Sequence, residues 1–527
     1  MNKIEALKNK KNGLEIIKDI KKFAEEGWES ISEDDVQRLK WYGLFLRKPT
    51  PGFFMLRVRI PNGKAFSHQV KVLSRIADFY GNGSLDITTR QQIQVRHLKI
   101  ENILEIFEFL NEVGLTSMQT GMDNVRNIMG CPISGINPKE TMDASWLVRA
   151  LSDEIVGNEK FSNLPRKFNM AVSCCPENCI HSETQDLAFV PSIKKEGDRE
   201  LSGFNVLAGG KLGSGGYRIA SSLDMFVLPE EVVETSLAIL SIYRDHGSRE
   251  NRKQNRLGHL IDEWGVEKFR KALSEYVGRS FSHEGKDLRE LQRSEHIGIY
   301  RQKQTLMNYV GLKVIVGRIE AKKLQEIAEL SEKYGNGEIR FTPAQSLIIP
   351  NVSDKKLGDF LDEPLLKEFV YHPSGVMKNL VSCVGSDYCH LSTIETKTRA
   401  RETAIALERK LGSATPISMH WSGCPAGCGN HLVADIGFLG KRVRIGKDIV
   451  EAVDVFMGGR AGPHPKQAVK ILENVPCSIL VDLLAQVIPY HTREKMHPVK
   501  GQKAAQRKKE LQSQANEKGL QPLPNCA

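Results

Sequence analysis

The sequence predicts an α+β protein made of two copies of one two-part unit, related by a pseudo-two-fold axis. The tetrapeptide Tyr-Gly-Asn-Gly occurs at residues 80–83 and again at residues 334–337. Each tetrapeptide follows an amphipathic helical stretch and precedes a strand-like run, and further matches follow in the same order about 250 residues apart. A repeat of that period indicates a duplicated domain pair rather than a solenoid. Strands and helices mixed within each copy favour the α+β class.

The first part of each copy has a strand, helix, strand, helix pattern. We expect strands over residues 85–95 and 339–349, with the same polar residues in register: Thr88 with Thr342 and Gln91 with Gln345. After the first strand, apolar residues recur at helical spacing and predict one helix face: Leu104, Phe107, Leu110 and Val113. The second copy repeats this plan with an apolar run at 314–316 and a helix over 321–334.

The second part of each copy mixes Gly-rich loops with strands and helices, such as a helix expected over residues 232–243. The matching motifs are Met122-Asp-Asn124 with Met377-Lys-Asn379, Gly130 with Gly385, Cys175-Pro-Glu-Asn-Cys179 with Cys424-Pro-Ala-Gly-Cys428, Asp186 with Asp435, and Gly209-Gly-Lys211 with Gly458-Gly-Arg460. None of the glycine motifs has the spacing of a dinucleotide fingerprint, so we expect no internal NADPH site.

Composition is that of a globular protein with several domains. The chain has 527 residues, of which 40% are hydrophobic and 26% charged, so three or four domains are expected. No apolar run is long enough to span a bilayer, and residues 1–22 lack the features of a signal or transit peptide. We therefore expect a cytoplasmic protein without membrane contact.

The formal net charge of +10 does not identify a partner. Residues 500–518 are rich in Lys, Gln and Ala, and we expect a solvated tail or a loose helix there. Basic and aromatic residues do not interleave as single-stranded nucleic acid prefers, so we expect no nucleic-acid partner.

Ten cysteines are too sparse for a disulfide scaffold, and clustered cysteines in such a protein more often bind metal or do chemistry. Eight of them form two clusters: Cys131, Cys174, Cys175 and Cys179 in the first copy, and Cys383, Cys389, Cys424 and Cys428 in the second. Cys477 and Cys526 have no cysteine or histidine nearby in sequence.

The second-copy cluster carries four thiols on two short loops, which can surround one iron–sulfur cluster. Buried structural cysteines and a structural zinc site are the alternatives. Zinc fits poorly because five residues separate Cys383 from Cys389, and zinc knuckles favour two to four.

The first copy has Ile128 and Ser134 where the second has Cys383 and Cys389. It lacks two of the four ligands, so we expect no equivalent cluster there. The first-copy cysteines could still bind something else, but the sequence favours buried free thiols.

Positive charge replaces the missing thiols in the first copy. Arg90 stands where the second copy has Ala344, Arg126 where it has Val381, and Lys167 precedes the Cys175 loop. Arg90 belongs to an expected strand in which alternate side chains point to the same side (Asp86, Thr88, Arg90, Gln92). Arg96 follows this run in the sequence. Solvated surface cations are the alternative. We interpret the set as an anion pocket that the pseudo-two-fold axis brings opposite the cysteines.

At these positions the chain resembles the siroheme-dependent nitrite and sulfite reductases, from about Phe53 to about Val487. The strongest motifs are Thr88-Thr-Arg-Gln91, Asp123-Asn-Val-Arg-Asn127, Leu164-Pro-Arg-Lys-Phe-Asn169, and the two cysteine pairs of the second copy. The resemblance implies a three-domain architecture with these parts: an N-terminal extension (1–48), a ferredoxin-like half-domain (49–118), a siroheme and substrate-binding domain (119–298), a second ferredoxin-like half-domain (299–371), an iron–sulfur and siroheme domain (372–490) and a basic tail (491–527).

The resemblance also implies residue roles. Cys383, Cys389, Cys424 and Cys428 would ligate a 4Fe–4S cluster, with Cys428 bridging to the siroheme iron. Arg90, Arg126 and Lys167 match substrate-site cations, and Arg96 is assigned to the siroheme, whose carboxylates need basic partners. Where this chain has Arg166-Lys-Phe-Asn169, the motif in the resembling sulfite reductases is Arg-Lys-Phe-Lys. The resemblance therefore implies that Asn169, which carries no charge, favours the singly charged nitrite.

The expected function is that of an assimilatory nitrite reductase, a monomer that takes electrons from ferredoxin. An assimilatory sulfite reductase with the same cofactors is the alternative enzyme. A non-catalytic zinc or iron–sulfur redox sensor is the alternative of a different class, and it leaves Arg90, Arg126 and Lys167 unexplained.

Overall fold

The computed structural model describes residues 2–213, 216–291, 294–412 and 415–496, without the side chains of residues 490–496. The chain divides into two compact units, Met1–Tyr371 with Ala461–Pro465 and His372–Arg460 with Lys466–Ala527. The tail expected at residues 500–518 lies outside the described residues. In the described part, none of the helices combines the length and the apolar character needed to cross a membrane.

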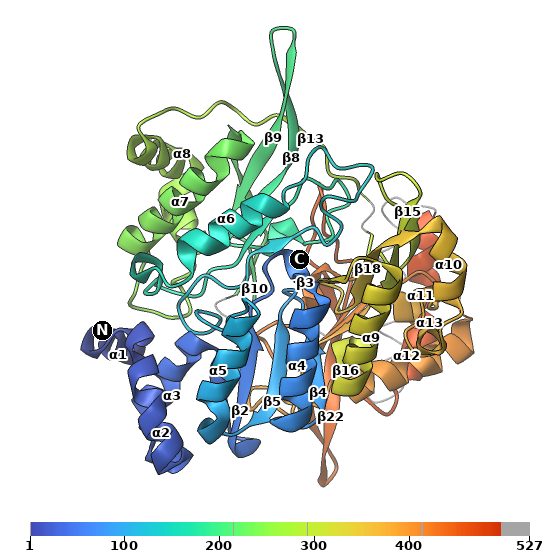
Figure 1. The fold of residues 1–527 in the computed structure, drawn as a ribbon. Coiled ribbons are helices and arrows are strands. Elements are labelled where there is room, and N and C mark those ends of the chain that lie inside the picture. The colour runs from blue at the N-terminus through green and yellow to red at the C-terminus, as the bar shows by residue number, and fades with distance from the viewer. Residues whose placement is uncertain (1, 214–215, 292–293, 413–414, 497–527) are drawn as a thin grey trace. The chain divides into compact units, whose positions relative to one another are not determined.

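Two five-stranded sheets of equivalent topology lie in the first unit (Figure 1). In spatial order, the first contains β1 (Leu44–Arg47), β2 (Thr50–Val58), β5 (Ile93–Leu98), β4 (Ser84–Ile87) and β16 (Arg318–Glu320). The second contains β14 (Gly298–Arg301), β15 (Met307–Leu312), β18 (Leu347–Ser353), β17 (Glu338–Phe341) and β3 (Lys64–Phe66). Each half therefore gives one edge strand to the sheet of the other half.

Reciprocal hydrogen bonds seal this strand exchange. The Gln91 side-chain amide donates to the carbonyl of Phe341 at 3.1 Å, and that of Gln345 donates to the carbonyl of Ile87 at 3.1 Å. Backbone hydrogen bonds are reciprocal as well. The N–H of Ser67 donates to the carbonyl of Gly337 at 2.7 Å, and the N–H of Ala321 donates to the carbonyl of Gly83 at 2.8 Å. Each contact has a counterpart with the halves exchanged, so the predicted pseudo-two-fold repeat is confirmed, and the two glycine-containing tetrapeptides lie where the halves meet.

One continuous core joins the halves. Helix α4 (Ser67–Phe79) and helix α9 (Ala321–Tyr334) lie side by side against the sheets (Figure 1). Val70, Leu73 and Ile76 of α4 share a buried cluster with Leu324 and Ile327 of α9. The helix predicted over residues 321–334 is present with those bounds.

Each expected strand around Thr88 and Thr342 is a hairpin instead. Residues 85–95 form β4 and β5 with a turn between them, and residues 339–349 form β17 and β18. The Thr88 hydroxyl accepts hydrogen bonds from the backbone N–H groups of Arg90 and Gln92, and Gln91 has a φ of 57°. Hydrogen bonds from a side chain to the backbone, together with a residue in the left-handed conformation, are typical of a turn that reverses the chain direction. The expected alternation Asp86, Thr88, Arg90, Gln92 is therefore wrong, and Arg90 lies in the turn.

Two further expectations are corrected. Helix α5 (Ile103–Glu112) buries Ile103, Ile106 and Leu110, whereas Leu104 and Phe107 are only partly buried and Val113 lies at its end. The buried face is thus rotated by about one residue from the expected one. The apolar run at 314–316 is a turn that includes the 3-10 segment Ile315–Gly317 between β15 and β16, not a strand.

The second parts of the two copies share one sheet topology. In each, three parallel strands are followed by two antiparallel ones. The first unit has β6 (Met129–Gly130), β7 (Met170–Val172), β8 (Leu187–Glu196), β9 (Arg199–Ala208) and β12 (Ser221–Val227), with β13 (Lys286–Asp287) beside β8. The second unit has β19 (Leu380–Ser382), β20 (Met419–Ser422), β21 (Ile436–Ile445), β22 (Asp448–Met457) and β23 (Val469–Pro476).

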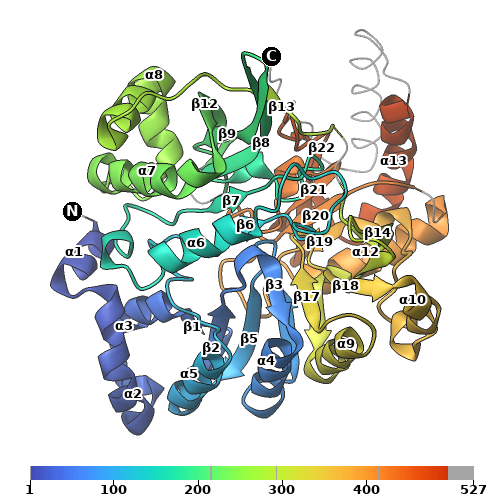
Figure 2. The same ribbon diagram turned by 45° about the horizontal axis from the view of Figure 1, so that its top comes forward.

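Helices cover these sheets. In the first unit α6 (Ser145–Ile155), α7 (Val232–His246) and α8 (Leu257–Val277) pack near β8, β9 and β12 (Figure 2). Helix α7 begins where predicted and runs three residues further. In the second unit α12 (Lys397–Leu411) packs against α11 (Gly375–Lys378) and α13 (Leu480–Met496).

The N-terminal segment is folded onto the first unit. It forms α1 (Lys3–Lys10), α2 (Ile20–Glu26) and α3 (Glu33–Arg38). Ile16, Ile20 and Phe23 join the same buried cluster as the two half-domains. The segment expected as an extension is therefore part of the core of this unit.

The strand exchange predicts a position-specific effect of added methyl groups. Gly63 (φ 67°) and Gly83 (φ 72°) both adopt the left-handed conformation, but a Cβ at Gly63 would lie 2.2 Å from the carbonyl oxygen of Phe341, whereas one at Gly83 meets nothing within 4 Å. Gly83→Ala should cost about 1–2 kcal/mol for backbone strain alone. Gly63→Ala should lower the thermal unfolding midpoint at least twice as much, measured at one scan rate. Equal shifts would show that the contact between the halves does not limit stability.

Candidate active site and cofactor cysteines

The segments that carry the predicted cations run beside each other in the first unit. Val125 and Phe168 form a parallel bridge, and the backbone N–H of Arg126 donates to the Phe168 carbonyl at 2.8 Å. This pairing places Arg126 next to the Lys167–Asn169 segment. Residues separated by about forty positions in sequence thus share one surface of the β6–β7 edge.

Arg126 is a buried cation with incomplete hydrogen bonding. Its Nη2 donates to the Met122 carbonyl at 2.8 Å, while its Nη1 is buried and has no hydrogen-bond partner among the described residues. Burial, followed by repulsion from Arg57 and Arg90, lowers the pKa of Arg126 well below its usual value, although Asp123 opposes the change. A buried guanidinium that repels its neighbours and has an unused donor fits an anionic ligand.

Arg90 is held by its turn. Its backbone carbonyl accepts a hydrogen bond from the Asn127 side chain at 3.0 Å, and its Nη1 lies 3.5 Å from the Gln185 side-chain oxygen. The guanidinium is half-buried. The turn therefore presents Arg90 to the same region as Arg126, which the repulsion between the two charges also indicates.

Asn169 is buried, and its backbone N–H donates to Asp186 Oδ2 at 2.7 Å. Asp186 in turn forms a two-point ion pair with Arg256, so its negative charge is compensated. The side-chain oxygen of Asn169 has no hydrogen-bond partner in the described part of the chain. Lys167, two residues earlier, is half-buried. The segment offers one cation and one neutral amide.

The Asp186 bond is part of the repeat. In the second copy the backbone N–H of Ser418 donates to Asp435 Oδ2 at 2.9 Å. Sequence comparison of the copies identifies both aspartates, but it gives no signal for Arg256, because this residue lies 70 positions from Asp186.

Asp123, the first residue of the Asp123–Asn127 motif, neutralises a second group of cations, and the sequence does not indicate this role. It forms a two-point pair with Arg252 at 2.8 Å and further pairs with Lys8 and Arg166. Burial by itself raises the pKa of Asp123, but the hydrogen bonds from Arg252 and the charges of Lys8, Arg252 and Arg166 outweigh it and keep the pKa below its usual value. Helix α1 is thereby tied to the Asp123–Asn127 motif.

Arg96 is paired within its own sheet. On β5, its Nε donates to Asp86 Oδ2 at 2.8 Å, and Arg318 from β16 shares the same carboxylate at 3.0 Å. The structure thus gives Arg96 an acidic partner, and its assignment to cofactor binding stays a prediction.

The four second-copy cysteines gather on two facing loops of the second unit. Cys383 follows β19 and Cys424 follows β20, and these strands are parallel neighbours with Ser382 opposite Trp421. The backbone N–H of Gly423 donates to the Cys383 sulfur at 3.2 Å. A Cβ at Gly423 would lie 1.8 Å from the Ser392 hydroxyl, so a larger residue there would require the Ser392 side chain to move.

Their number and their placement on two loops fit a multi-iron cluster. Burial raises the pKa of the Cys424 thiol to about 12, and the neighbouring Cys428, Cys389 and Cys383 add to this increase. Among the described residues, however, no three of these four sulfurs come within 4.8 Å of one another. A 4Fe–4S cluster places each thiolate on its own iron and accommodates this separation. Cys428 is exposed, whereas the other three are half-buried.

The duplicated fold, the cation set and the four gathered thiols define a two-repeat oxidoreductase. The Nitrite and sulphite reductase 4Fe-4S domain matches residues 121–281, and the Nitrite/Sulfite reductase ferredoxin-like half domain matches residues 46–113 and 300–366. The ferredoxin--nitrite reductase of Synechococcus elongatus is 43% identical over 495 residues, covering 93% of this chain and 96% of that protein.

The assimilatory ferredoxin-dependent nitrite reductase of Haloferax mediterranei is 35% identical, covering 89% of this chain and 85% of that protein. The solved structure of the Mycobacterium tuberculosis NirA protein superposes with a TM-score of 0.88 at 30% identity, covering 94% of both chains. The chain belongs to the nitrite and sulfite reductase family.

The Asp123 network predicts a large stability loss. Asp123→Asn removes the charge that compensates Lys8, Arg166 and Arg252, so we expect a destabilisation of about 3–5 kcal/mol. The stabilisation from ionised Asp123 is fully present above the usual carboxyl pKa. It is lost as the pH falls through the lowered pKa of Asp123 in the folded protein. Thermal unfolding at neutral pH should show the loss. Asp198→Asn, at an exposed position, is the control; if both variants unfold alike, the network is not structural.

Proposed function

We propose that this protein is an assimilatory nitrite reductase, which carries out the six-electron reduction of nitrite to ammonia with electrons from ferredoxin. Relatives named as ferredoxin--nitrite reductases, up to 43% identical over most of the chain, support the proposal. The structural observation that carries it is the buried Arg126 guanidinium, with its unused Nη1, on the segment paired with the neutral Asn169. This combination suits an anion of single charge.

The cofactors of the proposed reaction are a 4Fe–4S cluster and a siroheme, which supply single electrons and an iron face that binds the substrate. Cys383, Cys389, Cys424 and Cys428 would hold the cluster. Cys428, the exposed thiol of the set, would be the bridge to the siroheme. Arg96 remains our candidate for binding a siroheme carboxylate. It would bind this carboxylate either in place of Asp86 or while keeping its ion pair with Asp86.

Protein side chains supply charge and protons. Arg126 and Arg90 bind the nitrite oxygens, and their mutual repulsion is relieved when the anion enters. Lys167 donates a proton to a departing oxygen, because an ammonium group can release a proton while a guanidinium in practice cannot. Asn169 contributes a hydrogen-bonding amide without charge.

The proposal keeps the sequence-based division of the chain, with residues 49–118 and 299–371 as ferredoxin-like half-domains, 119–298 as the substrate-binding part and 372–490 as the cluster part. It also keeps a cytoplasmic monomer. The acidic surface of a ferredoxin is the expected complement of this basic protein.

A visible spectrum and steady-state kinetics test the function directly. The purified protein should show siroheme absorption and should reduce nitrite more efficiently than sulfite with a reduced artificial donor. A higher kcat/KM for sulfite would replace the proposal with an assimilatory sulfite reductase. Absence of siroheme absorption from a protein purified with full iron–sulfur content would favour a redox sensor.

The cluster assignment makes a prediction for each cysteine set. Cys428→Ser should lose siroheme and disturb the cluster, whereas Cys477→Ser, a half-buried cysteine of the same unit, should not. The double variant Cys175→Ser/Cys179→Ser should keep its iron, because Ile128 and Ser134 replace the partners that a cluster needs there. Iron and siroheme content measure both results, and loss of iron from the double variant would contradict the assignment.

Substrate choice should depend on Asn169. A bound dianion gains more from an added cation than a monoanion does, and one charge-assisted contact is worth about 1.5–3 kcal/mol. Asn169→Lys should therefore raise the ratio of sulfite to nitrite kcat/KM roughly tenfold to a hundredfold. Asn169→Gln keeps the amide and is the control for size. The interpretation fails if both variants change the ratio equally.

A further inference from the structure

Three thiols and one imidazole gather in the first copy, away from the residues assigned to substrate and cluster. Cys131, Cys175, Cys179 and His296 are each at most 2% exposed. They come from three segments: the end of β6, the loop after β7 and the residues before β14. The three cysteines belong to a small buried cluster that also contains Tyr309 and Ile348.

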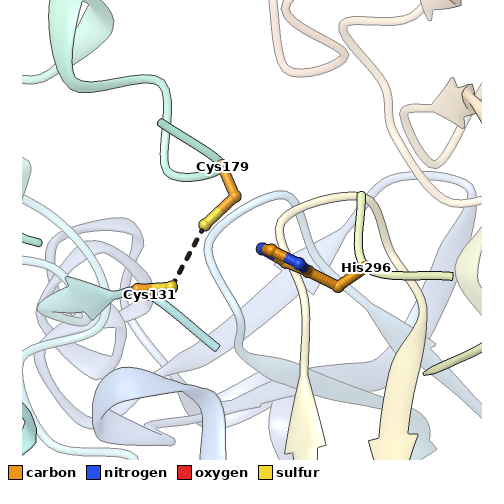
Figure 3. Close-up of side chains that lie close together, drawn as sticks. All are labelled: Cys131, Cys179 and His296. Atoms are coloured by element: carbon orange, nitrogen blue, oxygen red, sulfur yellow. Dashed lines mark hydrogen bonds between the residues drawn. The ribbon is translucent and has the colours of Figure 1, made fainter. Parts of the chain in front are cut away.

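The distances among Cys131, Cys179 and His296 are those of ligands around one ion. The sulfurs of Cys131 and Cys179 lie 3.5 Å apart, and these sulfurs and a ring nitrogen of His296 all lie within 4.8 Å of one another. Two thiolates on one tetrahedral zinc, with Zn–S bonds of about 2.3 Å, are about 3.8 Å apart. Figure 3 shows the imidazole of His296 directed toward the two sulfurs.

Cys175 lies in an adjoining set that shares His296, although the described residues give no set in which all three sulfurs lie within 4.8 Å of one another. A second set of ligand atoms within 4.8 Å joins Cys175, Glu177 and the same His296. The Cys175 sulfur accepts hydrogen bonds from the Asn137 side chain at 3.2 Å and from the Glu177 backbone N–H at 3.4 Å. Donors aimed at a sulfur stabilise a thiolate, which is the form that binds metal.

The surroundings of His296 are those of a metal-binding imidazole. Its Nδ1 lies 3.5 Å from a Glu177 carboxylate oxygen and 3.5 Å from the Tyr309 hydroxyl. A carboxylate at one ring nitrogen orients the ring and raises the basicity of the other. Lys139 lies 3.6 Å from the opposite oxygen of Glu177 and offsets its negative charge.

We propose that Cys131, Cys175, Cys179 and His296 bind one Zn²⁺ ion as a closed structural site. Three residues separate Cys175 from Cys179, within the two to four of a zinc knuckle. Each thiol releases its proton on binding, and no electron is transferred. The ion ties the β7 loop to β6 and to the start of the second half-domain. That loop ends at Gln185, whose side chain contacts Arg90.

Two other occupations are less suited to this geometry. A 4Fe–4S cluster needs each thiolate on a separate iron, and Cys131 and Cys179 are too close for that. A disulfide has a sulfur–sulfur distance of about 2.05 Å, and none of the cysteines in the described part of the chain forms one.

The test measures metals in the holoenzyme. Protein expressed with zinc in the medium and dialysed against a mild chelator should contain about one zinc per chain in addition to its iron. Cys131→Ala, Cys179→Ala and His296→Ala should each lower zinc at least tenfold. Cys174→Ala is the matched control, because Cys174 is equally buried but packs in a different apolar cluster. The control should keep its zinc, and iron content reports folding in every variant.

Zinc X-ray absorption of the unchanged protein tests the site without any substitution. The expected first shell is three sulfurs at about 2.3 Å and one nitrogen at about 2.0–2.1 Å. The proposal is overturned by wild-type protein that neither contains nor takes up zinc, by a shell of oxygen and nitrogen only, or by zinc content unchanged in Cys131→Ala. A Cys131–Cys179 disulfide in zinc-free protein would overturn it as well. None of these outcomes depends on which anion the enzyme reduces.

Discussion

The exchange of edge strands between the two half-domains is the constraint on which the first unit depends. β3 is an edge strand of the second sheet and β16 is an edge strand of the first, so neither half has its full set of five strands without the other. Gln91 and Gln345 then fill the junction with hydrogen bonds to buried carbonyls of the opposite half. Because an unpaired buried carbonyl is costly, the junction fixes the relative position of the halves. The turn that contains Gln91 also carries Arg90, so the same constraint positions the residue that we propose as a substrate-site cation.

Buried carboxylates around this frame are paired with arginines, whereas the buried Arg126 lacks a full set of partners among the described residues. Asp123 and Asp186 are buried, and each is matched by arginines that come from distant parts of the chain. Arg126 lies among these pairs without a full set of partners. Burying a cation is unfavourable unless an opposite charge compensates it. The compensated pairs therefore act as a rigid support, while Arg126 keeps a binding capacity that an anion can satisfy.

The two copies use one sheet topology for two kinds of metal chemistry. In the second copy, four thiols lie on the loops that follow two adjacent parallel strands, and we propose that they hold the cluster. In the first copy, the loss of two of those positions to Ile128 and Ser134 leaves Cys175 and Cys179 without their equivalents. Cys131 and His296 then approach Cys179 closely enough to hold a single ion. On this interpretation, the Cys175–Cys179 loop anchors the segment that leads to Asp186.

The sequence by itself determined the duplication, the fold class, helix α9 and the separation of cation and thiol sets, because these depend on periodicity and on matched positions. It placed Arg90 on a strand, since a turn made by one threonine hydroxyl and one left-handed glutamine leaves no mark in an alternating pattern. The partners of Asp123 and Asp186, and the approach of His296 to Cys131 and Cys179, were decided only by tertiary structure. These contacts join residues more than forty positions apart, and such proximity arises from packing of the whole unit rather than from any local spacing.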